Sequence, residues 1–227
     1  MSSTFTYKFY GRRKGRNLSK SKYSTLKFKG PKFLIDQNQI FEKDTCVTRE
    51  EKNILEIGFG DGENLINLAK KFPKINFIAA DPYVNSYIKV LEKILKYNLN
   101  NIKIWPNDIR LIINKFNKNI FDEIFIFHPD PWRKKRHQKR RLIQQSFIDC
   151  LSVILKTNGR IILASDDNIM TSWILEQFHL RNDFEWKVDN LYEALEKPMH
   201  LIETKYSKKA TLNNNTVNWF LYEKIQI

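Results

Sequence analysis

The feature that most constrains the fold is a repeated alternation of short apolar runs with stretches of helical periodicity, starting near residue 52. This alternation predicts strands at 53–59, 76–80, 101–105, 123–127 and 160–164. Between them it predicts amphipathic helices at 64–72, 86–97, 110–116, 141–155 and 168–180, and two further strands follow at 184–188 and 217–223. Five successive strand–helix pairs predict an α/β domain with a mostly parallel sheet and helices on both faces.

Parallel sheets of this kind bind ligands beyond the carboxyl ends of their strands, near the point where strand order reverses. The first predicted strand runs into Glu56-Ile57-Gly58-Phe59-Gly60-Asp61-Gly62. Glycines at such a turn let backbone amides approach a ligand closely. A dinucleotide-binding loop needs a glycine where Glu63 stands, which disfavours a nicotinamide-linked oxidoreductase. The pattern instead resembles the loop of S-adenosylmethionine-dependent enzymes.

Acidic side chains also follow the next two strands. Asp81 comes after the second strand, where a carboxylate can accept hydrogen bonds from a ribose diol. Asn107 and Asp108 follow the third, where a carboxylate can accept from an adenine amino group. Each acid alone could equally be a charge at a helix start. Together they favour an adenosyl cofactor.

The fourth strand is followed by His128-Pro129-Asp130-Pro131-Trp132. Two prolines stiffen the backbone around Asp130. A fixed carboxylate beside a large aromatic ring suits an unstacked purine, because the ring stacks and the acid holds the purine edge. The alternative is a proline-rich turn with a core tryptophan. After the fifth strand, Asp166 and Asp167 again place acids at the predicted ligand edge.

The positive charge is concentrated in two blocks. The arm (residues 1–32) holds ten Lys or Arg and the basic run (residues 133–141) holds seven, and neither contains Asp or Glu. The chain has 39 basic and 25 acidic residues in all, so the remainder carries a net charge of −3. A near-neutral body with two basic blocks indicates contacts with a polyanion, most simply a nucleic acid. The alternative is a solvated charged face.

Other classes of site are disfavoured. The two cysteines, Cys46 and Cys150, lie in no C-x-x-C pair, and the four histidines show no metal-ligand spacing, so we expect no metal. No apolar run is long enough to cross a membrane, and residues 1–16 lack the apolar core of a secretory signal. The expected location is the cytoplasm.

These motifs together resemble the bacterial tRNA (guanine-N7)-methyltransferase (TrmB) family from about residue 9 to the end, and the Pro129–His137 stretch is their most specific part. The resemblance implies the class I S-adenosylmethionine-dependent methyltransferase fold, Rossmann-like, with an antiparallel C-terminal strand. It implies S-adenosylmethionine as cofactor and the variable-loop guanine 46 of tRNA as target. The expected organisation is a partly flexible RNA-binding arm (1–32) and a methyltransferase domain (33–227), working as a monomer or weak homodimer.

The resemblance also implies roles for individual residues. Asp130 is the expected catalytic residue. The expected cofactor contacts are Glu56, Gly58, Gly60, Asp81, Asn107, Asp108 and Asp130. The expected substrate contacts are Lys134, Asp166, Thr204, Lys205, Tyr206 and Ser207. The basic residues expected on the RNA backbone are Arg12, Arg13, Lys14, Arg16, Arg136 and Arg140.

Two positions depart from the family pattern: His128 stands where the family has Phe, and Ser207 where it has Glu. The second departure bears on guanine recognition, which Asp166 or Asp167 could then share. Three alternative functions stay open at this stage: methylation of another RNA nucleotide, methylation of a small molecule, and RNA binding without catalysis. Two separate basic blocks disfavour the small molecule, and acids at five strand ends disfavour a module without catalysis.

Overall fold

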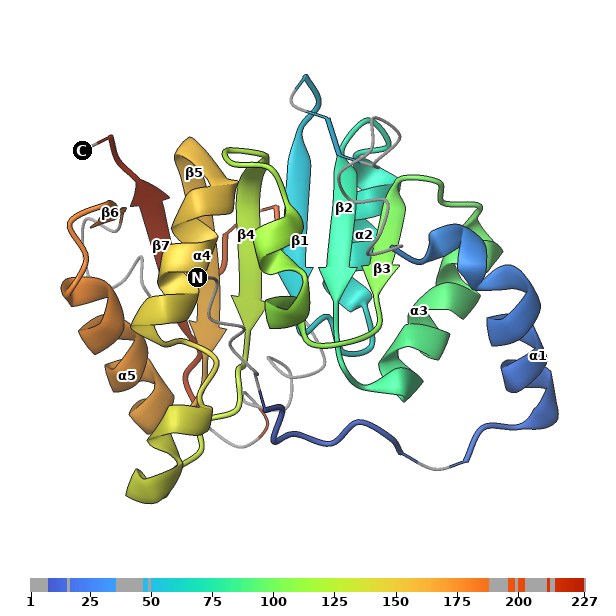
Figure 1. The fold of residues 1–227 in the computed structure, drawn as a ribbon, viewed down its shortest axis with the longest axis horizontal. Helices are drawn as coiled ribbons and strands as arrows, with labels where there is room; N and C mark the ends of the chain where they lie inside the picture. The colour runs from blue at the N-terminus through green and yellow to red at the C-terminus, as the bar shows by residue number, and fades with distance from the viewer. Residues whose placement is uncertain are drawn as a thin grey trace, which may run out of the picture.

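The computed structural model describes residues 8–15, 17–35, 47–48, 50–187, 196–198, 200–202, 212 and 215–226. Seven strands form one sheet in the order β3-β2-β1-β4-β5-β7-β6 (Figure 1). The strands are β1 (Asn53–Ile57), β2 (Asn76–Ala80), β3 (Ile102–Trp105), β4 (Phe121–Phe127), β5 (Leu155–Ser165), β6 (Phe184–Trp186) and β7 (Asn218–Lys224). The α-helices are α1 (Lys20–Lys29), α2 (Glu63–Lys71), α3 (Val84–Tyr97), α4 (Gln145–Ile154) and α5 (Asn168–His179).

The strand pairing confirms the predicted fold class. Strands β1 to β5 pair in parallel, and β7 runs antiparallel to both β5 and β6. Strand order reverses at β1, which lies between β2 and β4. The carboxyl ends of β1, β2 and β4 therefore meet at the switch point where ligands of such sheets bind.

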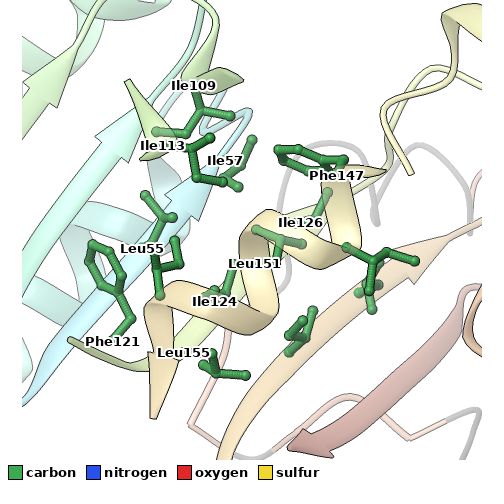
Figure 2. Close-up of a cluster of buried hydrophobic side chains, with 14 of the residues drawn as sticks. Leu55, Ile57, Ile109, Ile113, Phe121, Ile124, Ile126, Phe147, Leu151 and Leu155 are labelled. Atoms are coloured by element: carbon green, nitrogen blue, oxygen red, sulfur yellow. The ribbon is translucent and has the colours of Figure 1, made fainter. Parts of the chain in front are cut away.

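Alternate residues of each strand enter opposite sides of the core, as the pleat of a strand requires. Leu55 and Ile57 of β1 join the first hydrophobic cluster with Ile124 and Ile126 of β4, under α4 (Figure 2). Ile54 instead joins a second cluster with residues of α2 and α3. Both faces of the sheet are thus buried, which explains why its strands appear in the sequence as continuous apolar runs.

Several boundaries differ from the prediction. The expected helix at 110–116 is two short 3-10 turns, Ile109–Leu111 and Ile113–Lys115. The helix expected from residue 141 begins at Gln145, because a 3-10 turn over Lys135–Arg140 occupies the basic run. Strand β5 begins at Leu155, and its pairing with β4 jumps in register across the expected turn at 157–159.

Helix α1 lies within the arm and was not predicted. Ser19 accepts a hydrogen bond from the Lys22 amide at its start, and none of its side chains is buried. The helix lacks the apolar stripe by which helices are recognised in sequences, so periodicity gives no signal for it. It lies beside α3 (Figure 1), where Lys22 pairs with Glu92 at 3.6 Å.

Candidate active site

A cavity of about 510 Å³ opens at the switch point, at the carboxyl ends of β1, β2 and β4. This volume is ordinary for a site that binds a small molecule or cofactor. Segments far apart in the sequence meet in its wall: part of the arm, the glycine loop (residues 58–62), the end of β2, residues 108–110 after β3, the proline loop (residues 128–132), and Arg140 with Leu142. Of the site residues predicted from the sequence, those that line the cavity are Arg12, Gly58, Gly60, Asp81, Asp108, Asp130 and Arg140.

The glycine loop has the left-handed backbone that its sequence predicts. Gly58, Gly60 and Gly62 all have positive φ, between 52° and 79°. A Cβ added to Gly58 would meet no atom within 4 Å, so open space lies over this residue, whereas one on Gly62 would lie 2.2 Å from Val90 of α3. Gly58 thus leaves room for a ligand, and Gly62 permits the close packing of the loop on α3.

Asp81 connects the glycine loop to the end of β2. Its Oδ2 accepts from the Gly60 amide at 2.9 Å, and its Oδ1 accepts from the Tyr83 amide at 2.8 Å. Burial raises the pKa of Asp81 to about 6, although these two amides oppose the effect. The carboxylate is therefore mostly ionised at pH 7 and is held in place in the cavity wall, as an acceptor for a ribose diol should be.

Glu56 lies behind the glycine loop and is not among the residues that line the cavity. Its side chain is buried within β1, and its Oε2 accepts from Asn64 Nδ2 at 3.2 Å at the start of α2. Burial raises the pKa of Glu56 to about 8, so the side chain is mostly protonated at pH 7. Asn64 Oδ1 is buried without a hydrogen-bond partner among the described residues.

Asp108 lines the cavity, but its carboxylate is paired within the protein. Oδ2 receives Arg110 Nη2 at 2.6 Å, and Oδ1 receives the Arg110 amide at 3.0 Å. Asn107 does not line the cavity. Its Oδ1 accepts a hydrogen bond from the Asp108 amide at 2.9 Å and so helps to hold Asp108 in place. Arg110 was not anticipated as a partner of Asp108, since the sequence predicted it only as the start of a helix at 110–116.

The proline loop is rigid and strained. His128 and Trp132 at its two ends both have positive φ, 48° and 41°, which is uncommon for residues other than glycine. Pro129 and Pro131 restrict the backbone of Asp130, the one residue between them. Such strain is maintained only where the surroundings enforce it, and it is concentrated at functional sites. Asp130 projects at the exposed centre of the loop, where local desolvation raises the pKa of its carboxyl group.

Two arginines of the basic run brace the proline loop. Arg141 is almost fully buried, and its Nε donates to the Pro131 carbonyl at 2.8 Å. The Arg140 guanidinium lies 4.6 Å from the ring centre of Tyr10 and 5.1 Å from that of Trp132. Its Nε is buried and has no hydrogen-bond partner in the described part of the chain. Sequence alone could not separate these braces from a solvated basic run.

The other Lys and Arg side chains of the basic run face solvent. Lys134 and Arg136, expected to contact tRNA, are both exposed. Arg133 is also exposed and pairs with Asp167 at 2.8 Å. Asp167 in turn begins α5, where its Oδ1 accepts from the amides of Ile169 and Met170. Exposed cations beside the cavity are available to phosphates, whereas the Asp167 carboxylate is already engaged.

Residues 9–12 of the arm form one wall of the cavity. The wall includes Phe9, Tyr10, Gly11 and Arg12. The Tyr10 ring meets Trp132 edge-on, with centroids 6.3 Å apart. Further along, the Arg13 carbonyl accepts from the Val84 amide at 3.0 Å, and the Gly15 amide donates to Asn85 Oδ1 at 2.9 Å. The arm therefore contributes to the cavity as well as carrying charge, and its composition had indicated the charge alone.

The two acids after β5 differ in their partners. Asp166 Oδ1 lies 2.9 Å from Nδ1 of His128, which itself lines the cavity. Asp166 is not among the lining residues, so it lies just beyond the cavity wall.

The expected residues Arg16, Thr204, Lys205, Tyr206 and Ser207 lie outside the described residues. The described ranges contain no cluster of three His, Cys, Asp or Glu side chains suited to a metal ion. None of the helices described is both long and apolar enough to cross a membrane.

Comparison with known proteins places the chain in a family. Residues 50–220 match a family described as "Putative methyltransferase". A tRNA (guanine-N(7)-)-methyltransferase of Rhizobium johnstonii is 32% identical over 97% of this chain and 96% of its own. A bifunctional methyltransferase of Rickettsia prowazekii is 34% identical over 94% of this chain and 40% of its own length.

Among solved structures, an rRNA methylase from Streptococcus thermophilus superposes with a TM-score of 0.52 over 84% of this chain and 94% of that one. At 13% sequence identity this similarity concerns the fold alone. The relationship to the Rhizobium johnstonii enzyme, which extends over nearly the whole of both chains, is more specific. The chain therefore belongs to the family of tRNA (guanine-N(7)-)-methyltransferases.

Proposed function

We propose that this chain transfers a methyl group from S-adenosylmethionine to N7 of the variable-loop guanine, position 46, of tRNA, as a cytoplasmic monomer or weak homodimer. The observation that carries the proposal is the position of Asp130 and Trp132. Both line a cavity whose other walls include the glycine loop and Asp81. One cavity thus combines groups suited to a nucleoside cofactor with a rigid acid and aromatic ring suited to a purine.

The glycine loop, Asp81 and Asp108 are assigned to the cofactor. Gly58 offers a backbone without a side chain beside open space, and Asp81 offers fixed carboxylate oxygens in the cavity wall. When bound, S-adenosylmethionine supplies a methyl group activated by its sulfonium. Glu56 and Asn107 support this region from behind, Glu56 through Asn64 and Asn107 through the Asp108 amide. Their assigned role is to hold the ligand-binding backbone in place.

Asp130 is assigned to orienting the guanine and stabilising positive charge. Guanine N7 has a lone pair in the ring plane, so the reaction requires no base to remove a proton from it. The protein can therefore contribute positioning and electrostatics. Positive charge develops on the purine as the methyl group arrives, and a nearby carboxylate stabilises it. The brace formed by Arg141 keeps the backbone that carries Asp130 from moving.

The exposed cations are assigned to tRNA phosphates. Lys134 and Arg136 lie on the basic run beside the proline loop, and Arg12, Arg13 and Lys14 lie on the arm that crosses the cavity. Arg16 and the segment Thr204–Ser207 complete the proposed tRNA contacts on sequence grounds. Arg140 is assigned to the loop brace instead, because its guanidinium packs against the rings of both Tyr10 and Trp132.

Two matched substitutions test the division of roles. Asp130→Asn should lower kcat by at least 100-fold while the cofactor dissociation constant stays within about threefold, because a preorganised charge acts on the transition state. Asp81→Asn should do the reverse and weaken cofactor binding first. Cofactor binding is measured by calorimetry without RNA, and turnover with an unmodified tRNA transcript. Equal losses of affinity and turnover in Asp130→Asn would make this residue a cofactor ligand alone.

A further inference from the structure

His128 connects the ends of two neighbouring strands through both its backbone and its side chain. Its amide, directly after β4, donates to the Ala164 carbonyl of β5 at 2.8 Å. Its Nδ1 lies 2.9 Å from Oδ1 of Asp166, directly after β5. Because a carboxylate only accepts, the imidazole must carry its proton on Nδ1 at this contact. The side chain is 7% exposed, so little water competes for the hydrogen bond.

The backbone conformation of His128 is part of this arrangement. With φ at 48° the residue is left-handed, a conformation in which His, Asn and Asp are enriched over other non-glycine types. Strained residues of this kind persist where the surrounding structure determines them. The conformation is therefore consistent with a site in which the direction of the imidazole matters.

Asp166 is the acid after β5 that a substrate can reach. Its neighbour Asp167 is engaged by the first amides of α5 and by Arg133. The Asp166 side chain is 33% exposed, and its contact with His128 involves Oδ1. The second oxygen, Oδ2, is thereby given a defined direction. His128 lines the cavity, so it joins the cavity wall to a carboxylate just outside that wall.

We propose that His128 is a positioning residue: it fixes Asp166 so that this carboxylate accepts from N1–H and the amino group of the target guanine. The proposal rests on the proposed function. Guanine presents two adjacent donors on its base-pairing edge, N1–H and the amino group, whereas N1 of adenine carries no proton to donate. A carboxylate of fixed direction therefore selects guanine, and a freely rotating one selects it less well. An ordered acceptor also costs less conformational entropy when the base arrives.

The test compares two substitutions at the same residue. His128→Leu removes the donor, and His128→Asn keeps an amide donor near the position of Nδ1 in a residue that tolerates the left-handed backbone. The leucine variant should raise KM for an unmodified tRNA transcript roughly tenfold, the scale of one hydrogen bond to a charged group, and leave the cofactor dissociation constant unchanged. The asparagine variant should return KM to within about threefold of wild type. His179→Leu, at an exposed histidine of α5, is the control.

A double-substitution cycle with Asp166→Asn separates positioning from a general effect on folding. If His128 acts through Asp166, the double variant should be no worse than Asp166→Asn alone. Losses that multiply would overturn the proposal, as would wild-type KM in His128→Leu or no recovery in His128→Asn.

A spectroscopic measurement keeps the contact testable if the leucine variant is too unstable to assay. In protein labelled with ¹⁵N-histidine, the Nδ1 proton of His128 should give a low-field resonance that disappears in Asp166→Ala. Its absence from the wild-type spectrum would overturn the contact itself. If the resonance is present but wild type makes no 7-methylguanosine, the proposed function fails, and guanine as the group that Asp166 recognises fails with it.

Discussion

Replacing Glu56 by Gln should stabilise the cofactor-free protein in a way that depends strongly on pH. Burial raises the pKa of Glu56 from its ordinary value of 4.5 to about 8. Between these values the folded state keeps the proton and the unfolded state releases it, so stability falls as pH rises through this window. Each pH unit in this window lowers the free energy of unfolding by about 1.4 kcal/mol. The total loss is roughly 3 kcal/mol at pH 7, and well above pH 8 it grows no further. Gln is neutral throughout and escapes this cost.

The assay is chemical denaturation of wild type and Glu56→Gln at a series of pH values from 5 to 9. The difference in unfolding free energy should be small at pH 5, reach about 3 kcal/mol near pH 7 and level off above pH 8. Gln can also still accept from Asn64 Nδ2, as Glu56 does. Glu92→Gln, which makes the same change at an exposed position of α3, is the matched control. A difference for Glu56→Gln that does not change with pH would refute the reasoning.

Three further predictions follow from the walls and braces of the cavity. Tyr10→Ala should weaken cofactor binding several-fold in calorimetry without RNA, because Tyr10 lines the cavity; unchanged affinity would contradict that contribution. Arg141→Met should lower the unfolding free energy by roughly 2–4 kcal/mol, because it removes a buried side chain and its hydrogen bonds to two part-buried carbonyls. A wild-type midpoint in denaturant unfolding would exclude the brace. Replacing both Lys134 and Arg136 by Ala should make the plot of log binding constant against log salt concentration less steep, by the contribution of nearly two phosphate contacts. Lys71→Ala, at an exposed lysine of α2, should leave this slope unchanged. Equal slopes for the double variant and wild type in filter binding would argue against a tRNA contact at Lys134 and Arg136.

The fold was predictable because its buried sheet leaves a simple pattern. Strands covered on both faces form continuous apolar runs such as NFIAA, and the predicted strand at 76–80 matches β2. Boundaries failed where local polar structure interrupts a periodic stretch, as at the basic run before α4. Helix α1 was missed because it buries none of its side chains and so has no apolar periodicity.

The candidate site was predictable where a strand end determines the position of a residue. Gly58, Asp81, Asp108 and Asp130 all reach the cavity because parallel strands bring their carboxyl ends to one edge. The partners of these residues were not predictable. Whether an acid is paired within the protein, as Asp108 is with Arg110, depends on side-chain directions that a single sequence does not encode.

The contacts that the arm makes with the cavity were also not predictable from the sequence. Its charge was evident from composition, but Tyr10 reaches Trp132 only because the chain folds back across the carboxyl ends of the strands. Such long-range contacts carry no local signal. The same holds for Arg140, which stands in a basic run yet packs its guanidinium against two aromatic rings.

The most direct measurement incubates the purified protein with labelled S-adenosylmethionine and unmodified tRNA transcripts, then digests the RNA and identifies the labelled nucleoside. We expect the label in 7-methylguanosine, and we expect it to disappear when the variable-loop guanine is replaced by adenine. Label in any other nucleoside, or label that survives this replacement, would contradict the assigned target.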